Sequence, residues 1–456
     1  MENRLVKLKQ LFNNPDNRSL ANNIIISFFI KGLAMVLAVF MTPAYIKYFN
    51  NQAALGIWFT LISIFTWILN FDLGIGNGLR NKLVKAFIDN DNKKIQEYIS
   101  SAYILMGFIS VIVICVGIVV IRLIDWNNVL NISNSEVSNS CITITVIIIF
   151  AGIIIQFWLK LITSILYAMQ KTALPSLVTF ISSLLIFCYI VFFKTNDVST
   201  NLVNLALVQV FTINIPLIII SIITFSRWIN GIWPSIKNFR WDYAKSITSL
   251  GGTFFVIQIS LMVISSSNEI LITKLYSPKY TVEYQIYYKW FSLAVVLFSL
   301  ITQPMWSAFT KAFEEKRYVW IFKVYKIFNI LALIGTCGCI LLAIYFQPII
   351  NLWLGSEAII TKFSITLNFV AFSACMMFIN ASTSVANGCS KLKCQLLCTL
   401  VGAFLKVFLS VVFSRYFDSW YFIMLTNVVA LIPLVIIQPI ITHRILKQAI
   451  NNGYID

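Results

Sequence analysis

Long apolar stretches, separated by short polar segments, fill the chain between residues 22 and 442. A helix needs about 20 mostly apolar residues to cross a bilayer core. Lipid cannot satisfy open backbone groups, so each stretch is predicted to be helical; the alternation of a β-barrel is absent. The twelve predicted spans are 22–45, 53–79, 98–122, 141–168, 174–194, 203–225, 247–273, 284–309, 327–347, 361–386, 396–415 and 420–442.

The composition favours an all-α integral membrane protein. Hydrophobic residues make up 59% of the 456 residues and charged residues only 11%, against about 25% charged residues in soluble domains. This excludes a soluble enzyme, a disordered chain and a secreted disulfide scaffold. With His443 as the only histidine and most of the nine cysteines in apolar runs, we expect no metal, no cofactor, no disulfide and no histidine-based catalytic residue.

The net charge of +17 indicates an excess of basic residues in the loops that set membrane topology, rather than a nucleic-acid site. Placing the N-terminus inside puts 23 Lys and Arg residues in cytoplasmic segments and 7 on the opposite side. Basic residues gather in cytoplasmic loops. The pattern therefore predicts both termini on the cytoplasmic side, with no nucleic-acid partner.

The chain also divides into two similar halves. The first and seventh spans begin 225 residues apart, close to half the chain length of 228, and each half has six spans. An even number of spans gives the halves the same orientation, as in parallel repeats of transporters. The predicted parts are a basic N-terminus (1–21), a first lobe (22–225), a cytoplasmic linker (226–246), a second lobe (247–442) and a cytoplasmic C-terminus (443–456).

Ionisable residues inside the spans are the candidate functional groups. Each costs about 2.5–3.5 kcal/mol at the bilayer centre unless it is paired, solvated or near a helix end. Four lysines against two acids leave the interior positive, which would attract anions. The six residues are Lys31, Asp72, Lys160, Glu269, Lys289 and Lys406.

Depth along the spans separates these residues. Lys31 and Asp72 lie at similar depth in the first two spans and form either a structural brace or an ion-coupling pair. Lys160 and Lys406 lie near mid-depth without an obvious acidic partner, which predicts a wet, cationic interior. Glu269 and Lys289 lie near span ends, where a rim salt bridge or plain solvation is expected.

A glycine-rich helix end follows Asp72. Gly74, Gly76 and Gly78 allow either close helix packing or gating. Arg80 follows directly and either contacts a lipid phosphate or sets topology. Pro43 and Pro304 are candidate hinges or ordinary kinks.

Local motifs carry a resemblance to a known family. The segments Lys31–Gly32, Thr42–Tyr45, Leu55–Trp58 and Asp72–Leu79 resemble Wzx-type polysaccharide and O-antigen flippases of the multidrug/oligosaccharidyl-lipid/polysaccharide (MOP) exporter superfamily. Similar motifs follow in the second half, at Gln303–Trp306 and Asn387–Lys391.

The resemblance implies a two-lobed exporter in the bacterial inner membrane. It would flip an undecaprenyl-diphosphate-linked oligosaccharide to the outer leaflet by alternating access. Its partners would be this substrate, membrane lipid and other polysaccharide-assembly proteins. Lys31, Lys160, Lys406 and Arg80 would bind the substrate, and Asp72 would couple transport to protons or sodium.

Three alternatives stay open at this stage. Two are exporters of the same superfamily, for a peptidoglycan precursor or for drugs. The third is a membrane-embedded oligosaccharide polymerase, which the short predicted outer loops disfavour. No ATP-binding or nucleophilic motif is present in the sequence, so a transporter would draw on an ion or substrate gradient.

Overall fold

The computed structural model describes residues 15–51, 54–59, 61–62, 74–130, 137–229, 231–276, 278–354 and 359–451. Helices and short connections make up this part of the chain, and it contains no strand. The all-α prediction is confirmed. Eleven helices in the described residues are long and apolar enough to span a membrane. Residues 63–73, in the middle of the predicted second span, lie outside the described residues.

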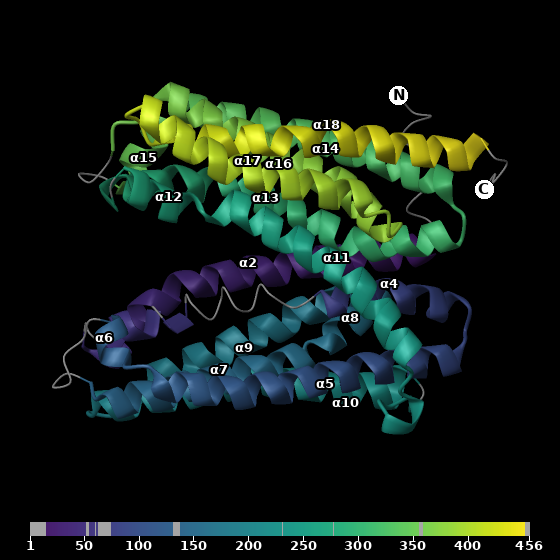
Figure 1. Ribbon diagram of the computed structural model, residues 1–456, viewed down its shortest axis with the longest axis horizontal. Coiled ribbons are helices and arrows are strands. Elements are labelled where there is room, and N and C mark those ends of the chain that lie inside the picture. Colours follow the sequence, from purple (N-terminus) through teal and green to yellow (C-terminus); the bar gives the residue numbers. More distant parts are fainter. Residues whose placement is uncertain are drawn as a thin grey trace. The chain divides into compact units, whose positions relative to one another are not determined.

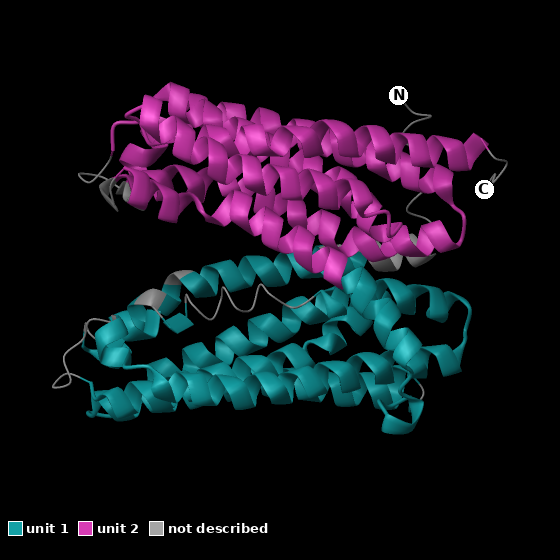
Figure 2. Ribbon diagram, viewed as in Figure 1, with its two compact units in different colours: residues 1–251 teal, residues 252–456 magenta. Residues whose placement is uncertain are grey.

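The chain forms two compact units, residues 1–251 and 252–456 (Figure 2). In each unit the long helices run side by side, as Figure 1 shows. The first unit holds α2 (Pro15–Phe49), α4 (Ile75–Ile88), α5 (Asn92–Leu123), α6 (Trp126–Leu130), α7 (Asn139–Leu159), α8 (Leu161–Ala168), α9 (Ala173–Phe192), α10 (Val198–Ile223), the π-helical turn η1 (Thr224–Trp228), the 3-10 turn η2 (Ile236–Asn238) and the start of α11 (Trp241–Ser266).

The second unit begins inside α11, because the boundary between the units falls after Gly251. The cytoplasmic linker predicted over 226–246 therefore does not end at the unit boundary. The remaining helices are α12 (Asn268–Leu275), α13 (Pro278–Glu314), α14 (Tyr318–Ile344), α15 (Phe346–Leu354), α16 (Phe363–Gly388), α17 (Lys393–Tyr416) and α18 (Tyr421–Asn451).

Polar side chains cap the N-termini of several helices. Asp91, Ser138 and Asp197 each accept a hydrogen bond from a backbone N–H in the first turn, of α5, α7 and α10 respectively. Such caps satisfy amide groups that the helix itself leaves open. Hydrogen bonds from Lys94 hold the pKa of the Asp91 carboxyl below its usual value. The bond from the backbone amide contributes most, and the bond from the side chain contributes next.

Hydroxyl groups within the spans bond back to their own helix. Thr145, Ser221 and Ser382 donate to the carbonyls of Cys141, Leu217 and Phe378, four residues earlier. These bonds satisfy hydroxyls that lipid could not. Hydrophilic residues therefore occur inside the spans without any need for water.

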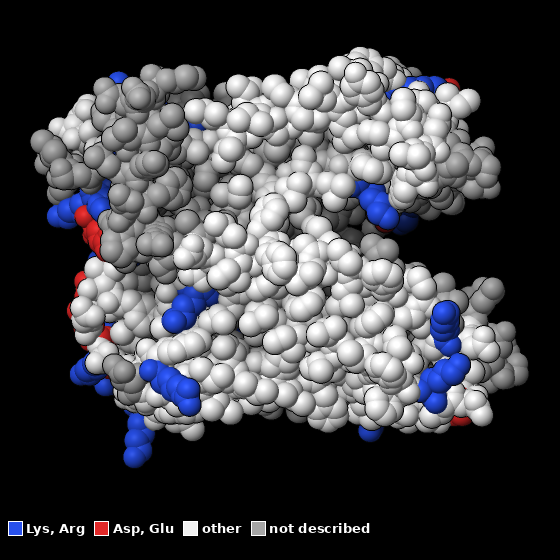
Figure 3. Space-filling model, turned by 180° about the vertical axis from the view of Figure 1, so that it is seen from behind, with Lys and Arg blue, Asp and Glu red and all other residues white. Residues whose placement is uncertain are grey.

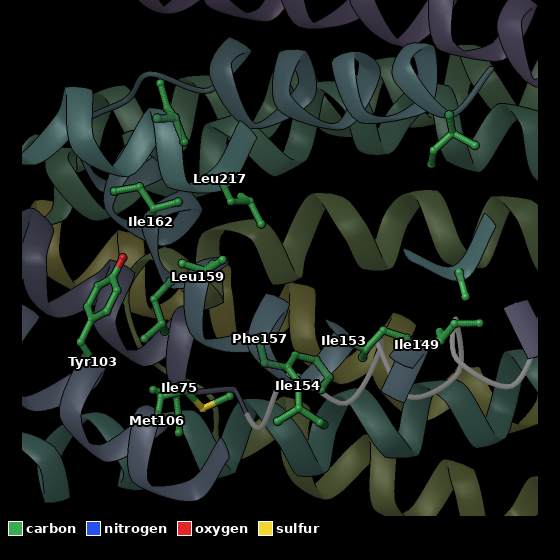
Figure 4. Close-up of a cluster of buried hydrophobic side chains, with 14 of the residues drawn as sticks. Ile75, Tyr103, Met106, Ile149, Ile153, Ile154, Phe157, Leu159, Ile162 and Leu217 are labelled. Atoms are coloured by element: carbon green, nitrogen blue, oxygen red, sulfur yellow. The ribbon is translucent and has the colours of Figure 1, made fainter. Parts of the chain in front are cut away.

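The core of the first unit is an apolar cluster contributed by several helices (Figure 4). Ile153 and Phe157 of α7 are buried in it, with Ile162 of α8 and Leu217 of α10. Side chains such as Val111 and Val116 of α5 are exposed instead. On the face shown in Figure 3, charged side chains lie mostly toward the helix ends, and a broad band between them carries few. An apolar exterior with charged ends suits a membrane-embedded unit.

The segment between α10 and α11 is tied to α5 by two serine side chains. The Ser235 backbone N–H donates to Ser100 Oγ (3.0 Å), and the Arg240 N–H donates to Ser101 Oγ (3.0 Å). Ser101 Oγ also lies 3.1 Å from the Arg240 carbonyl, and the Arg240 side chain meets Glu97 at 3.5 Å. The linker is thus fixed to the first unit.

The predicted orientation can be checked by cysteine labelling. Asn128→Cys, after α5, should react with a membrane-impermeant maleimide in intact spheroplasts, whereas Asn92→Cys, before α5, should react only after lysis. Both positions are exposed, and a span separates them. The unsubstituted chain gives the background from native thiols. The opposite pattern would contradict the predicted topology.

Candidate functional site

A cavity of about 190 Å³ lies in the first unit, where α7, α8, α9 and α10 meet. Its walls combine amide and hydroxyl side chains with aliphatic ones, and Lys160 is the only ionisable residue among them. The lining residues are Gln156, Lys160, Thr163, Pro175, Val178, Thr179, Ser182, Ser183, Ile186, Gln209, Ile213 and Leu217.

Lys160 occupies the break between α7 and α8. Its backbone N–H still donates to the Gln156 carbonyl (2.7 Å), but its own carbonyl accepts from the Thr163 N–H (2.9 Å) and hydroxyl (2.7 Å). This tighter turn divides the helix into α7 and α8, although Asn139–Ala168 still forms one candidate membrane span, as predicted over 141–168. Because Gln156 precedes Lys160 by four residues, both side chains reach the same cavity.

The cavity offers hydrogen-bonding groups that the described protein does not use. The Lys160 side chain is half-buried, and its ammonium has no ion pair or hydrogen bond with any described residue. The buried Oε1 atoms of Gln156 and Gln209 also lack a partner in the described part of the chain. A buried acceptor without a partner is costly. The cavity is therefore suited to an anionic group flanked by hydrogen-bond donors such as sugar hydroxyls.

Sequence reasoning identified Lys160 but missed the amides beside it. Gln156 and Gln209 lie in otherwise apolar spans, and Thr179 and Ser182 lie on the facing helix α9. The spacing of Gln156 and Lys160 was the available signal. Gln209 could not be placed beside them without knowing that α10 packs on α7.

Arg80 is buried inside the first unit, with 3% of its surface exposed. Its guanidinium carbon lies 4.7 Å from the centre of the Tyr167 ring of α8, in cation–π geometry. Arg80 therefore faces Tyr167 of α8, whereas the sequence had suggested either contact with a lipid phosphate or a role in setting topology.

The glycines near the start of α4 lie against other helices. Gly74 has a positive φ of 66°, and a methyl group there would overlap the carbonyl of Gly251 in α11. A methyl group on Gly76 would lie 2.6 Å from Ser164 Oγ, and one on Gly78 would overlap the Ile247 carbonyl. Close backbone approach of α4 to α11 therefore needs glycine at positions 74 and 78, whereas Gly76 faces the Ser164 side chain of α8.

The other candidates in the first unit are less constrained. Lys31 is half-buried on α2 and forms no ion pair with a described residue. Asp72, the coupling candidate, lies outside the described residues, so the hypothesis of a Lys31–Asp72 pair stays a prediction. Pro43 is an exposed residue within the continuous helix α2.

The candidates in the second unit have different surroundings. Lys406 on α17 is fully buried, and its ammonium nitrogen forms hydrogen bonds with three oxygen atoms. It therefore does not face the wet interior that the sequence predicted. Pro304 is buried within α13. Glu269 and Lys289 do not pair with each other: Glu269 accepts from Gln285, and the Lys289 ammonium lies 5.3 Å from the Trp353 ring centre.

Metal and disulfide chemistry find no support. All nine cysteines are free thiols, and the described residues contain no cluster of three or more metal-ligating side chains.

Comparisons with known proteins place the fold. No protein-family model matches the chain, and no curated protein sequence matches it. Solved structures do match. An outward-facing multidrug resistance MATE family transporter of the MOP superfamily is 13% identical, with a TM-score of 0.73, over 97% of this chain and 99% of that chain.

Two further structures agree over similar lengths. The bent form of the Vibrio cholerae MATE transporter VcmN is 13% identical, with a TM-score of 0.72, over 96% of this chain and 100% of that chain. A MOP superfamily transporter from Pyrococcus furiosus is 13% identical, with a TM-score of 0.73, over 94% and 95%. The chain therefore has the fold of MATE transporters of the MOP superfamily. At this identity the likeness establishes the fold and not the substrate.

Proposed function

We propose that this chain is an exporter that flips an undecaprenyl-diphosphate-linked oligosaccharide across the bacterial inner membrane. The observation that carries the proposal is the cavity around Lys160, with its single cation and its unpaired amide oxygens. One cation and several uncharged hydrogen-bonding side chains line it, and no acid does. An ammonium attracts phosphate oxygens, while amides and hydroxyls suit sugars.

The charge of this cavity distinguishes the proposal from a drug exporter for cationic compounds. One protein of similar structure is a multidrug resistance transporter, so a drug substrate is the second candidate. In the similar Pyrococcus furiosus transporter, reverse polarity of the binding pocket suggests a different function. Here a lone lysine makes the first-unit cavity repel cations. We therefore favour an anionic substrate.

In the proposed cycle the Lys160 ammonium binds the diphosphate, and the Gln156 and Gln209 amides form hydrogen bonds with the adjoining sugars. The lipid tail stays in the membrane, and the two lobes alternate between the two sides of the bilayer. A proton or sodium gradient drives the cycle through Asp72. Lys31 either pairs with that acid or joins the phosphate site. The multi-pass chain lies in the inner membrane with both termini inside, beside other polysaccharide-assembly proteins.

Loss of the protein tests this function in cells. The strain without it should accumulate lipid-linked oligosaccharide on the inner leaflet and lose surface polysaccharide, and a plasmid copy should restore both. Proteoliposomes should flip the same lipid but should not move a cationic dye. Dye transport without lipid flipping would favour the drug exporter instead.

A further inference from the structure

Lys406 is a fully buried lysine in the second unit, and no carboxylate among the described residues is paired with it. It lies in α17 with no exposed surface. Its Nζ donates to Asn268 Oδ1 (2.7 Å), to the Ile423 carbonyl (2.7 Å) and to Thr426 Oγ1 (3.0 Å). These three neutral oxygens, from α12 and α18, form what we call the oxygen cage. No described carboxylate forms an ion pair with Lys406.

The cage is oriented by a second set of hydrogen bonds. The Asn268 amide nitrogen donates to the Ser265 carbonyl (3.0 Å) and to the Tyr284 hydroxyl (3.1 Å), which leaves its Oδ1 facing Lys406. The Thr426 hydroxyl lies 2.7 Å from the Ile423 carbonyl and 3.0 Å from Ser410 Oγ, and when it donates to either of them its lone pairs can accept from Lys406. Each of the three cage atoms therefore presents a lone pair to one point.

Three convergent acceptors match the three N–H donors of a protonated ammonium. A neutral amine has only two N–H groups, so one of the three oxygens would then have to donate to the nitrogen, which only the Thr426 hydroxyl could do. A set of carbonyl, amide and hydroxyl oxygens is also the donor type that hard cations select. The geometry thus defines a site for one positive charge.

We propose that the oxygen cage is a binding site for an ammonium-sized monovalent cation and that the chain fills it with Lys406. The side chain acts as a tethered cation that joins α17 to α12 and α18. Because this cation is covalently attached, the cage is occupied whatever the ionic composition of the solution. Its occupancy in the native protein is therefore independent of sodium and potassium.

Chemical rescue tests this proposal on the full-length protein in detergent. Lys406→Ala removes three carbons and the nitrogen, which is the skeleton of n-propylammonium. The variant should unfold about 5 °C below the native protein, because the cage oxygens lose their partner. Propylammonium chloride should restore at least half of that loss. At equal concentration, 1-propanol and N-methylglucamine chloride should not.

Further variants keep the proposal falsifiable. Lys406→Met, of similar length but uncharged, should be destabilised like the alanine variant but should not be rescued, because its side chain fills the space. If Lys406→Ala cannot be purified, Thr426→Val removes one acceptor and should lower the unfolding temperature by a smaller amount. Native stability of Lys406→Met, rescue by propanol equal to that by propylammonium, or no effect of Thr426→Val would each overturn the proposal.

Discussion

Replacing Lys160 with glutamate is expected to lower export of the lipid-linked oligosaccharide by about ten-fold or more, because a hydrogen bond to a charged group contributes roughly 1.5–3 kcal/mol and 1.4 kcal/mol is a factor of ten. The substitution places a carboxylate beside the Gln156 and Gln209 oxygens and would repel the diphosphate. Lys160→Ala should fall between the glutamate variant and the native protein, and Lys160→Arg should be milder than alanine. Surface polysaccharide, measured per amount of protein in the membrane, reports the effect.

Lys289→Ala is the matched control for this series. It removes another lysine from a predicted span, but Lys289 is exposed, lies over Trp353 and does not line the cavity. Export should stay near the native level in this variant. If Lys160→Glu exports normally while its amount in the membrane is unchanged, the cavity does not hold the substrate and the proposed function loses its main support.

A methyl group at Gly251 is expected to disrupt the first unit, although the same change at Gly252 should be harmless. At Gly251 the new Cβ would lie 2.8 Å from the Gly74 oxygen and 3.1 Å from the Ile75 nitrogen, both backbone atoms that cannot rotate away. At Gly252 it would meet no atom within 4 Å. Overpacking of this kind costs about 1–3 kcal/mol, whereas alanine in a helix is otherwise preferred over glycine by about 0.5–1 kcal/mol.

Thermal unfolding of the two purified variants measures this difference. Gly251→Ala should unfold at a lower temperature than the native protein, and Gly252→Ala at the same or a slightly higher temperature. Because both are the same substitution at neighbouring positions of α11, helix propensity cancels in the comparison. Equal unfolding temperatures would show that α4 and α11 do not approach as closely as described.

Hydropathy predicted the helices well because the bilayer requirement acts on composition. The predicted span 174–194 corresponds to α9 (Ala173–Phe192) within two residues at each end. Breaks inside apolar segments were not predictable in this way. Within the span predicted over 141–168 the regular helix is interrupted at Lys160, and within 247–273 it is interrupted at Ser267. Their cause is local backbone geometry, to which average hydropathy is blind.

The candidate site was predictable only where charge alone reveals it. Lys160 stood out as a lysine at mid-depth, but Gln209 reaches the cavity through the packing of α10 on α7, which no local pattern encodes. The sequence showed no acidic partner for Lys406, and its actual partners were not predictable because all three are neutral oxygens. The packing of Tyr167 against Arg80 was not predictable either, because the position of Arg80 next to the glycines does not reveal it.

The passage of α11 from one unit to the other bears on how the molecule can be divided. Residues of α11 up to Gly251 belong to the first unit, and the Ile247 carbonyl covers Gly78. A fragment that ends within the predicted linker, at residue 235 for example, would leave this glycine face of α4 open. Cutting after residue 251 would keep the face covered but would sever a continuous helix. The two halves suggested by span counting are therefore not interchangeable modules, and reassembly from separate polypeptides would need the first turns of α11 to be supplied in trans.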